Sequence, residues 1–268
     1  MARIFCLRLA MNKKGPFEIG IGTLLSYSGG NPAGKSFNDV KRGIIVTNKG
    51  KREAVILKAS INTSELSREL FCACIAYLLD LPVPSQFLVL DPSSFTLMYA
   101  CGFLDYPNLY QAFEQKNKSK EILMLLYRWQ KFNEVVTFDE LIQNVDRHVG
   151  NILWGGRKEF VLIDHGLTFG HFINQRKNRL LQEFLPCILD ASHIDKEIQK
   201  CTKIAAQYSP QLGNDSLQLL LKNVQGISKD IEEKAKMLLT VLEDQQRSLN
   251  RNLLRRLPEV PLFSQVQK

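Results

Sequence analysis

Three metal-competent side chains lie close together in the middle of the chain, at Asp146, Asn151 and Asp164. Asn151 follows Asp146 by five positions, Asp164 follows Asn151 by 13, and Gly166 comes two residues later. An Asp followed five positions later by an Asn, and then by an Asp-x-Gly, is the arrangement that phosphoryl-transfer enzymes use to handle ATP and magnesium. The spacing therefore predicts transfer of a phosphoryl group, with ATP and Mg²⁺ as the cofactors.

Each residue of this motif has a role that the chemistry explains, because phosphoryl transfer depends mainly on positioning and charge neutralisation. Asp146 would accept or orient the proton of the attacking hydroxyl. Asn151 and Asp164 offer the hard oxygen ligands that Mg²⁺ prefers. His148 is expected to brace the loop by hydrogen bonding, with acid–base catalysis as the alternative. Arg147 is expected either to bind a phosphate or to hold the loop.

The residues around the motif predict the elements that position it. The apolar runs 152–154 and 160–163, separated by a polar turn, are typical of a β-hairpin that would hold Asp164 on a rigid strand. Residues 120–133 carry apolar side chains at helical spacing. Thr137 and Glu140 then fit a capping box, which predicts a new helix beginning at Thr137 and leading into Asp146.

A strand and a helix upstream carry charged residues suited to a nucleotide site. The strand-like run 54–60 contains Lys58, whose ammonium would pair with the phosphates of ATP. A helix is predicted to begin at residues 62–65 and to end before the prolines of residues 81–84. Glu65 and Glu69 would share one face of this helix, and one of them is expected to pair with Lys58.

Two further strands are predicted at residues 86–91 and 95–99, on either side of a turn that contains Pro92. The second strand leads into residues 100–103, where a hinge would let backbone groups contact adenine. From about residue 178 onward the pattern is helical, including a long helix over residues 229–254.

These motifs resemble a known family. Residues 138–147 and 162–166 look like the corresponding segments of the HipA-like kinases, above all the small single-domain branch, and the Leu-Lys-Ala-Ser around Lys58 fits that family as well. The pattern Asp-Arg-His-x-x-Asn-Ile-Leu, followed by Ile-Asp-x-Gly, is also similar to that of phosphatidylinositol 3- and 4-kinases, which share the kinase-like fold.

The resemblance implies an α+β, two-lobed protein-kinase-like fold. Residues 1–102 would form a β-rich, ATP-binding N-terminal lobe, and residues 103–268 a mainly helical catalytic lobe. It also implies a serine/threonine protein kinase, selects Glu69 as the partner of Lys58, and suggests an antitoxin-like regulatory protein as a partner. A lipid or small-molecule kinase of the same fold, and a nucleotide-binding regulator with little catalysis, remain open.

A second phosphate-binding motif competes with this interpretation. Residues 29–36 satisfy the P-loop pattern Gly-x4-Gly-Lys-Ser, ending in Lys35 and Ser36. A P-loop must open a helix, yet no apolar face at helical spacing appears before Gly43. We therefore expect a loop that covers the phosphates with backbone amides and with Lys35 or Ser36. A P-loop NTPase is the minor alternative, and a bare surface loop is the other.

Composition is that of a globular enzyme, with 45% hydrophobic and 23% charged residues in 268 positions. The net charge of +8 favours anionic partners such as a nucleotide, a nucleic acid or an acidic protein, without choosing among them. No apolar stretch approaches 18 residues, and the first ten residues lack the core of a signal peptide. We therefore expect a cytoplasmic protein with no membrane partner.

Overall fold

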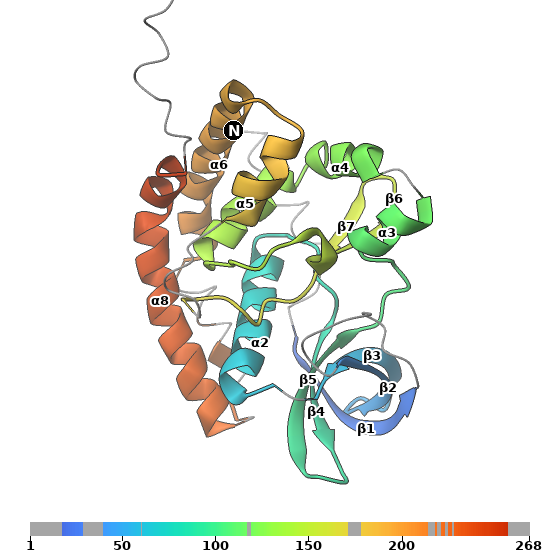
Figure 1. The fold of residues 1–268 in the computed structure, drawn as a ribbon. Coiled ribbons are helices and arrows are strands. Elements are labelled where there is room, and N and C mark those ends of the chain that lie inside the picture. Colours follow the sequence, from blue (N-terminus) through green and yellow to red (C-terminus); the bar gives the residue numbers. More distant parts are fainter. Residues whose placement is uncertain are drawn as a thin grey trace, which may run out of the picture.

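The computed structural model describes residues 18–28, 40–59, 61–116, 119–170, 178–213, 218, 221–222, 225–226 and 228–256. As predicted, the fold is mixed α+β, with a β-rich N-terminal part and a helical C-terminal part (Figure 1). The division into lobes at residue 102 stays a prediction.

Five strands in the N-terminal part form a small closed barrel. They are β1 (Gly20–Ser28), β2 (Val40–Thr47), β3 (Arg52–Lys58), β4 (Gln86–Asp91) and β5 (Thr96–Gly102), in the order β1-β2-β3-β5-β4. All neighbours are antiparallel except β1 and β4, whose parallel pairing closes the barrel. Apolar side chains fill the interior, among them Ile45, Val55, Leu57 and Val89. Closure gives each of the five strands a hydrogen-bonded neighbour on both sides.

Helix α2 (Thr63–Leu78) lies between the barrel and the helical part. It begins as predicted, because the side chain of Asn62 accepts a hydrogen bond from the Glu65 amide at 2.9 Å. Its apolar face, which includes Leu70 and Phe71, is buried in the main hydrophobic core. Because the same core continues through the helices that follow, α2 is packed against residues from both ends of the chain.

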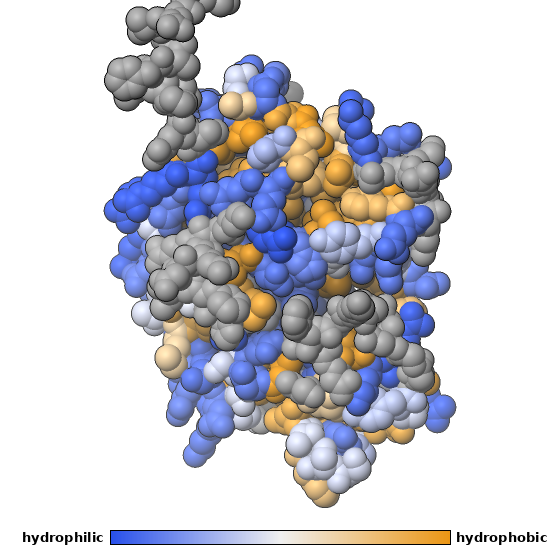
Figure 2. All heavy atoms as spheres, viewed as in Figure 1, coloured by the Kyte–Doolittle hydropathy of each residue, from blue (hydrophilic) through white to orange (hydrophobic). Residues whose placement is uncertain are grey.

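The C-terminal part contains α3 (Leu109–Lys116), α4 (Ser119–Tyr127), α5 (Phe132–Leu141), α6 (Ala191–Gln211) and α8 (Lys229–Leu254). Three short helical turns, η1 (Val149–Asn151), η2 (Leu180–Phe184) and η3 (Leu185–Cys187), and the hairpin of β6 (Ile152–Gly156) and β7 (Glu159–Leu162) complete it. Helix α8 packs along α2, α5 and α6. Its inward face is apolar, whereas hydrophilic residues dominate its edge of the surface in Figure 2.

One predicted helix boundary is wrong. The helix expected over residues 120–133 ends at Tyr127, and α5 already begins at Phe132, so Thr137 lies in mid-helix and caps nothing. The Thr137 hydroxyl instead donates to the carbonyl of Asn133 at 2.7 Å. A threonine can bond back to the preceding turn in this way, so the apparent capping pattern did not define a helix start.

Among the described residues, no helix is both long enough and apolar enough to cross a membrane.

Candidate active site

The predicted β-hairpin is confirmed, and it places Asp164 two residues beyond the end of β7. Asp164 has a φ of 61°, in the left-handed region that non-glycine residues adopt at a cost. Asp tolerates this conformation better than most residues do. The backbone therefore turns sharply at Asp164 and directs its carboxylate back toward the barrel, where Lys58 ends β3.

Lys58 joins two carboxylates from distant parts of the chain. Its ammonium donates to Oε1 of Glu69, on α2, and to Oδ1 of Asp164 at 2.8 Å. Burial opposes the charged ammonium, but Glu69 and Asp164 outweigh it and hold the pKa of Lys58 above its ordinary value. Burial likewise would raise the pKa of Asp164, yet Lys58 holds it below the ordinary value, so Asp164 is an anion near neutral pH. Burial raises the pKa of the Glu69 carboxyl, which Lys58 opposes.

The two glutamates of α2 have different positions. Glu69 is fully buried, and its Oε2 accepts the backbone N–H of His165 at 2.8 Å. Glu65 instead lies against Gly166, where a Cβ would come within 2.7 Å of Glu65 Cγ. The structure thus places Glu69, rather than Glu65, beside Lys58, and Gly166 lets α2 approach the segment after β7.

The loop before the hairpin holds Asp146 and Asn151 through its own amides. The Asn144 side chain accepts the backbone N–H of Asp146 at 3.0 Å, and Asn151 Nδ2 donates to the Asp146 carbonyl at 2.9 Å. No described residue donates to Asn151 Oδ1 or to Asp164 Oδ2. An amide oxygen and an ionised carboxylate oxygen form the donor set that Mg²⁺ prefers, so these two residues fit the metal that the sequence predicts.

Arg147 is buried and clamps this loop. Its Nε donates to both carboxylate oxygens of Asp139, on α5, at 3.1 and 3.2 Å. Its Nη1 donates to the carbonyls of Asn151 at 3.0 Å and of Ile163 at 2.6 Å. Arg147 thus holds together the residue that precedes β6 and the residue that follows β7. Of the two predicted roles, Arg147 holds the loop, and its burial keeps it away from any phosphate.

His148 also braces the loop. Its Nδ1 accepts the backbone N–H of Gly150 at 3.0 Å, and its ring stacks on Tyr110 with centroids 5.8 Å apart. Its Nε2 lies 3.9 Å from Asp146 Oδ2, beyond hydrogen-bonding distance. Burial lowers the pKa of His148, despite the neighbouring Asp146 carboxylate.

Arg179 lies beside the catalytic loop, although no pattern in the sequence pointed to it. Its Nη1 lies 3.4 Å from Asp146 Oδ1, and its Nε donates to Glu183 at 2.7 Å. Because 33 residues separate Arg179 from Asp146, no local spacing could have linked them. The remaining predicted residues, Lys35 and Ser36 of the Gly29–Ser36 motif, lie outside the described residues.

Comparison with known proteins gives the family. Residues 91–265 match the family described as the LepB N-terminal domain. The chain belongs to the LepB N-terminal domain family. In this family member, the matched region begins at the end of β4 and includes Asp146, Asn151 and Asp164, whereas Lys58 and Glu69 precede it. No curated protein matches the chain.

Among solved structures, this LepB N-terminal domain family member is similar to the Helicobacter pylori proinflammatory kinase CtkA. The two are 15% identical with a TM-score of 0.51, over 89% of this chain and 98% of that chain. At this identity the likeness establishes a kinase-like fold and nothing finer.

Proposed function

We propose that this LepB N-terminal domain family member is an ATP- and Mg²⁺-dependent phosphotransferase of the HipA-like kind that acts on serine or threonine hydroxyls of a protein. The observation that carries the proposal is the contact of Lys58 with both Glu69 and Asp164. It brings a buried cation from the barrel to a carboxylate that lies beside the loop of Asp146 and Asn151. The kinase-like fold supports the same proposal.

The residues would divide the work as follows. Lys58, held in place by Glu69, would bind the phosphates of ATP. Asn151 and Asp164 would hold Mg²⁺, which would supply positive charge to neutralise the phosphates of ATP. Asp146 would orient the acceptor hydroxyl and take its proton, because its carboxylate is partly exposed at the same loop.

A lipid acceptor is a second candidate because the run Asp146-Arg147-His148, followed by Asn151, is similar to the pattern of phosphatidylinositol kinases. The two candidates require the same groups around ATP and differ only in the hydroxyl that faces Asp146. A regulator that binds nucleotide without catalysis would have no need for Asp146, whose loop is nevertheless braced by Asn144 and Asn151.

The experiment is phosphate transfer from γ-labelled ATP with Mg²⁺, with one arm containing a mixture of protein substrates and the other containing vesicles with phosphoinositides. We expect incorporation into protein, and Asp146→Asn should lower the rate by about 10²–10⁴-fold, the usual contribution of a general base. Asp105→Asn is the matched control because Asp105 is an exposed carboxylate outside the site.

Three outcomes separate the alternatives. Label in the lipid arm alone would replace the protein acceptor with a lipid. The proposal that the protein is an enzyme would be refuted if neither label incorporation nor ATP hydrolysis occurred and Asp146→Asn behaved as the wild type. Loss of nucleotide binding in Lys35→Ala, together with normal turnover in Asp146→Asn, would instead favour the P-loop alternative.

A further inference from the structure

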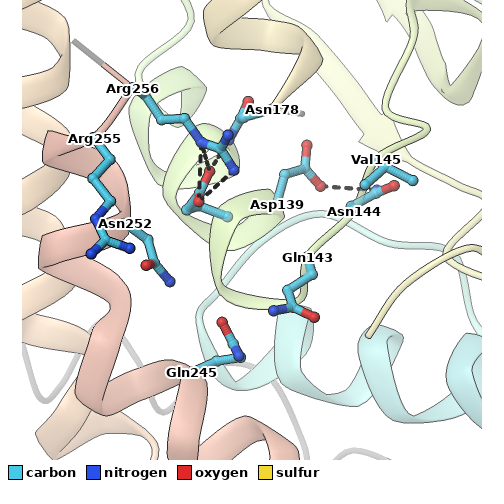
Figure 3. A pocket seen from close by; sticks show the side chains of 10 residues that line it. Asp139, Gln143, Asn144, Val145, Asn178, Gln245, Asn252, Arg255 and Arg256 are labelled. Atoms are coloured by element: carbon cyan, nitrogen blue, oxygen red, sulfur yellow. Dashed lines mark hydrogen bonds and ion pairs between the residues drawn. The ribbon is translucent and has the colours of Figure 1, made fainter. Parts of the chain in front are cut away.

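A cavity of about 110 Å³ lies behind the catalytic loop, between α5, α8 and the turn that leads into Asp146 (Figure 3). The turn contributes Gln143, a non-glycine residue with a φ of 53°. Two residues that line the cavity, Asn144 and Val145, directly precede Asp146. A ligand in this cavity would therefore touch the catalytic loop without entering the ATP site.

Five carboxamides line the cavity, and those of Asn144 and Asn178 are hydrogen-bonded within the protein, whereas the other three are incompletely hydrogen-bonded. Figure 3 shows Gln143 from the turn, and Gln245 and Asn252 from α8, directed toward the same hollow. Gln245 Oε1 is buried and has no hydrogen-bond partner, whereas the Gln143 side chain is half-buried and open to water. Buried polar atoms in proteins are paired in about 90% of cases or more. The buried Gln245 Oε1 therefore indicates a polar ligand that can donate a hydrogen bond to it.

The charges around the cavity favour an anion. Both lining carboxylates are neutralised: Asp139 pairs with Arg147, and Glu140 pairs with Arg256 at 3.1 Å. Arg255 also lines the cavity, is exposed, and has no ion-pair partner among the described residues. Among the described residues that line the cavity, the one charge without an opposite partner is therefore positive.

We propose that the cavity is a binding site for hydrogen phosphate. The volume suits a ligand of about five or six heavy atoms, since an apolar cavity of ~150 Å³ holds benzene. The phosphate oxygens would accept hydrogen bonds from Arg255 and from the carboxamides. At neutral pH hydrogen phosphate also keeps an O–H, which can donate to Gln245 Oε1. Bound phosphate would link α8 to the turn before Asp146 and so regulate the mobility of the catalytic loop.

The test is calorimetric titration of the full chain at neutral pH with inorganic phosphate, sulfate and phosphoserine. We expect one phosphate site. Sulfate, and phosphoserine as its dianion, lack the O–H and should bind about tenfold more weakly or worse, because Gln245 Oε1 would stay unpaired.

Two variants test the proposed contacts, one on α8 and one at the residue that follows it, and a third variant serves as the control. Gln245→Leu and Arg255→Gln should each weaken phosphate binding by about tenfold or more. Arg251→Gln, an exposed arginine one turn earlier that does not line the cavity, should leave it unchanged. Far-UV circular dichroism would verify that all three variants are folded, which is expected for Arg255 because it is exposed.

The proposal would be overturned by any of four results. These are no phosphate binding, equal affinity for sulfate, tighter binding of phosphoserine, and an equal loss of binding in Arg251→Gln and Arg255→Gln. Displacement of phosphate by a non-hydrolysable ATP analogue with Mg²⁺ would also overturn it, since the phosphate would then occupy the ATP site. None of these readouts depends on phosphotransfer activity. The phosphate site can therefore be refuted while the proposed function stands, and the proposed function can be refuted while the phosphate site stands.

Discussion

Replacing Asp139 with leucine tests how the catalytic loop is held. In the wild type, the Asp139 carboxylate accepts two hydrogen bonds from Arg147 and one from Asn144, and both charged side chains are fully buried. Asp139→Leu leaves the guanidinium buried with only the two backbone carbonyls of Asn151 and Ile163 as partners. Breaking one side of a buried ion pair costs about 3–5 kcal/mol.

The second half of this prediction concerns the double variant Asp139→Leu/Arg147→Met. Because replacement of a whole buried ion pair by apolar residues is often neutral, the double variant should recover most of the lost stability. It should not recover phosphotransfer, since the carbonyls of Asn151 and Ile163 would lose their common donor. Urea denaturation monitored by circular dichroism measures the free energy of unfolding. If Asp139→Leu lowered the free energy of unfolding by less than about 1 kcal/mol, the proposed role of the Asp139–Arg147 pair in holding the loop would be refuted. A double variant as unstable as the single variant would refute it as well.

Three further predictions follow from the packing and charges. Burial lowers the pKa of His165 well below 6.5, so the unfolded chain binds the proton more readily and stability falls as the pH drops below about 6.5, by up to ~1.4 kcal/mol per pH unit. Urea titrations at several pH values should show a flatter dependence for His165→Asn. Gly43→Ala should lower the free energy of unfolding by about 1–3 kcal/mol, because its Cβ would collide with a neighbouring leucine methyl group. Gly102→Ala, whose Cβ would have its nearest neighbour at 3.6 Å, should be neutral in the same urea denaturation experiment. Glu69→Gln should raise the KM for ATP by about tenfold or more, because Lys58 loses a charged partner; unchanged initial-rate kinetics would contradict this.

Local patterns predicted the parts of the site whose residues are near one another in sequence. The hairpin that carries Asp164 and the helix that carries Glu69 follow from periods of two and 3.6 residues and from a capping asparagine. The pairing of Lys58 with one of two glutamates was also expected, and the structure identifies Glu69.

Contacts that depend on folding could not be predicted in this way. Nothing local indicates that β1 pairs in parallel with β4 to close the barrel, or that Arg179 lies beside Asp146. Burial of Arg147 was equally hidden, since a loop arginine between Asp146 and His148 is normally exposed. Thr137 shows the opposite error, in which a local pattern was present but the helix had already begun at Phe132.

The packing of α2 against α8 has a consequence for how the protein is made. About 150 residues separate the two helices, and Leu70 and Phe71 of α2 lie beside Ile231 and Ala235 of α8. At a synthesis rate of about 5–20 residues per second, the ribosome reaches α8 some 8–30 s after it completes α2. During that interval this part of the apolar face of α2 lacks its final cover, whereas the barrel, whose core is separate, can form without α8.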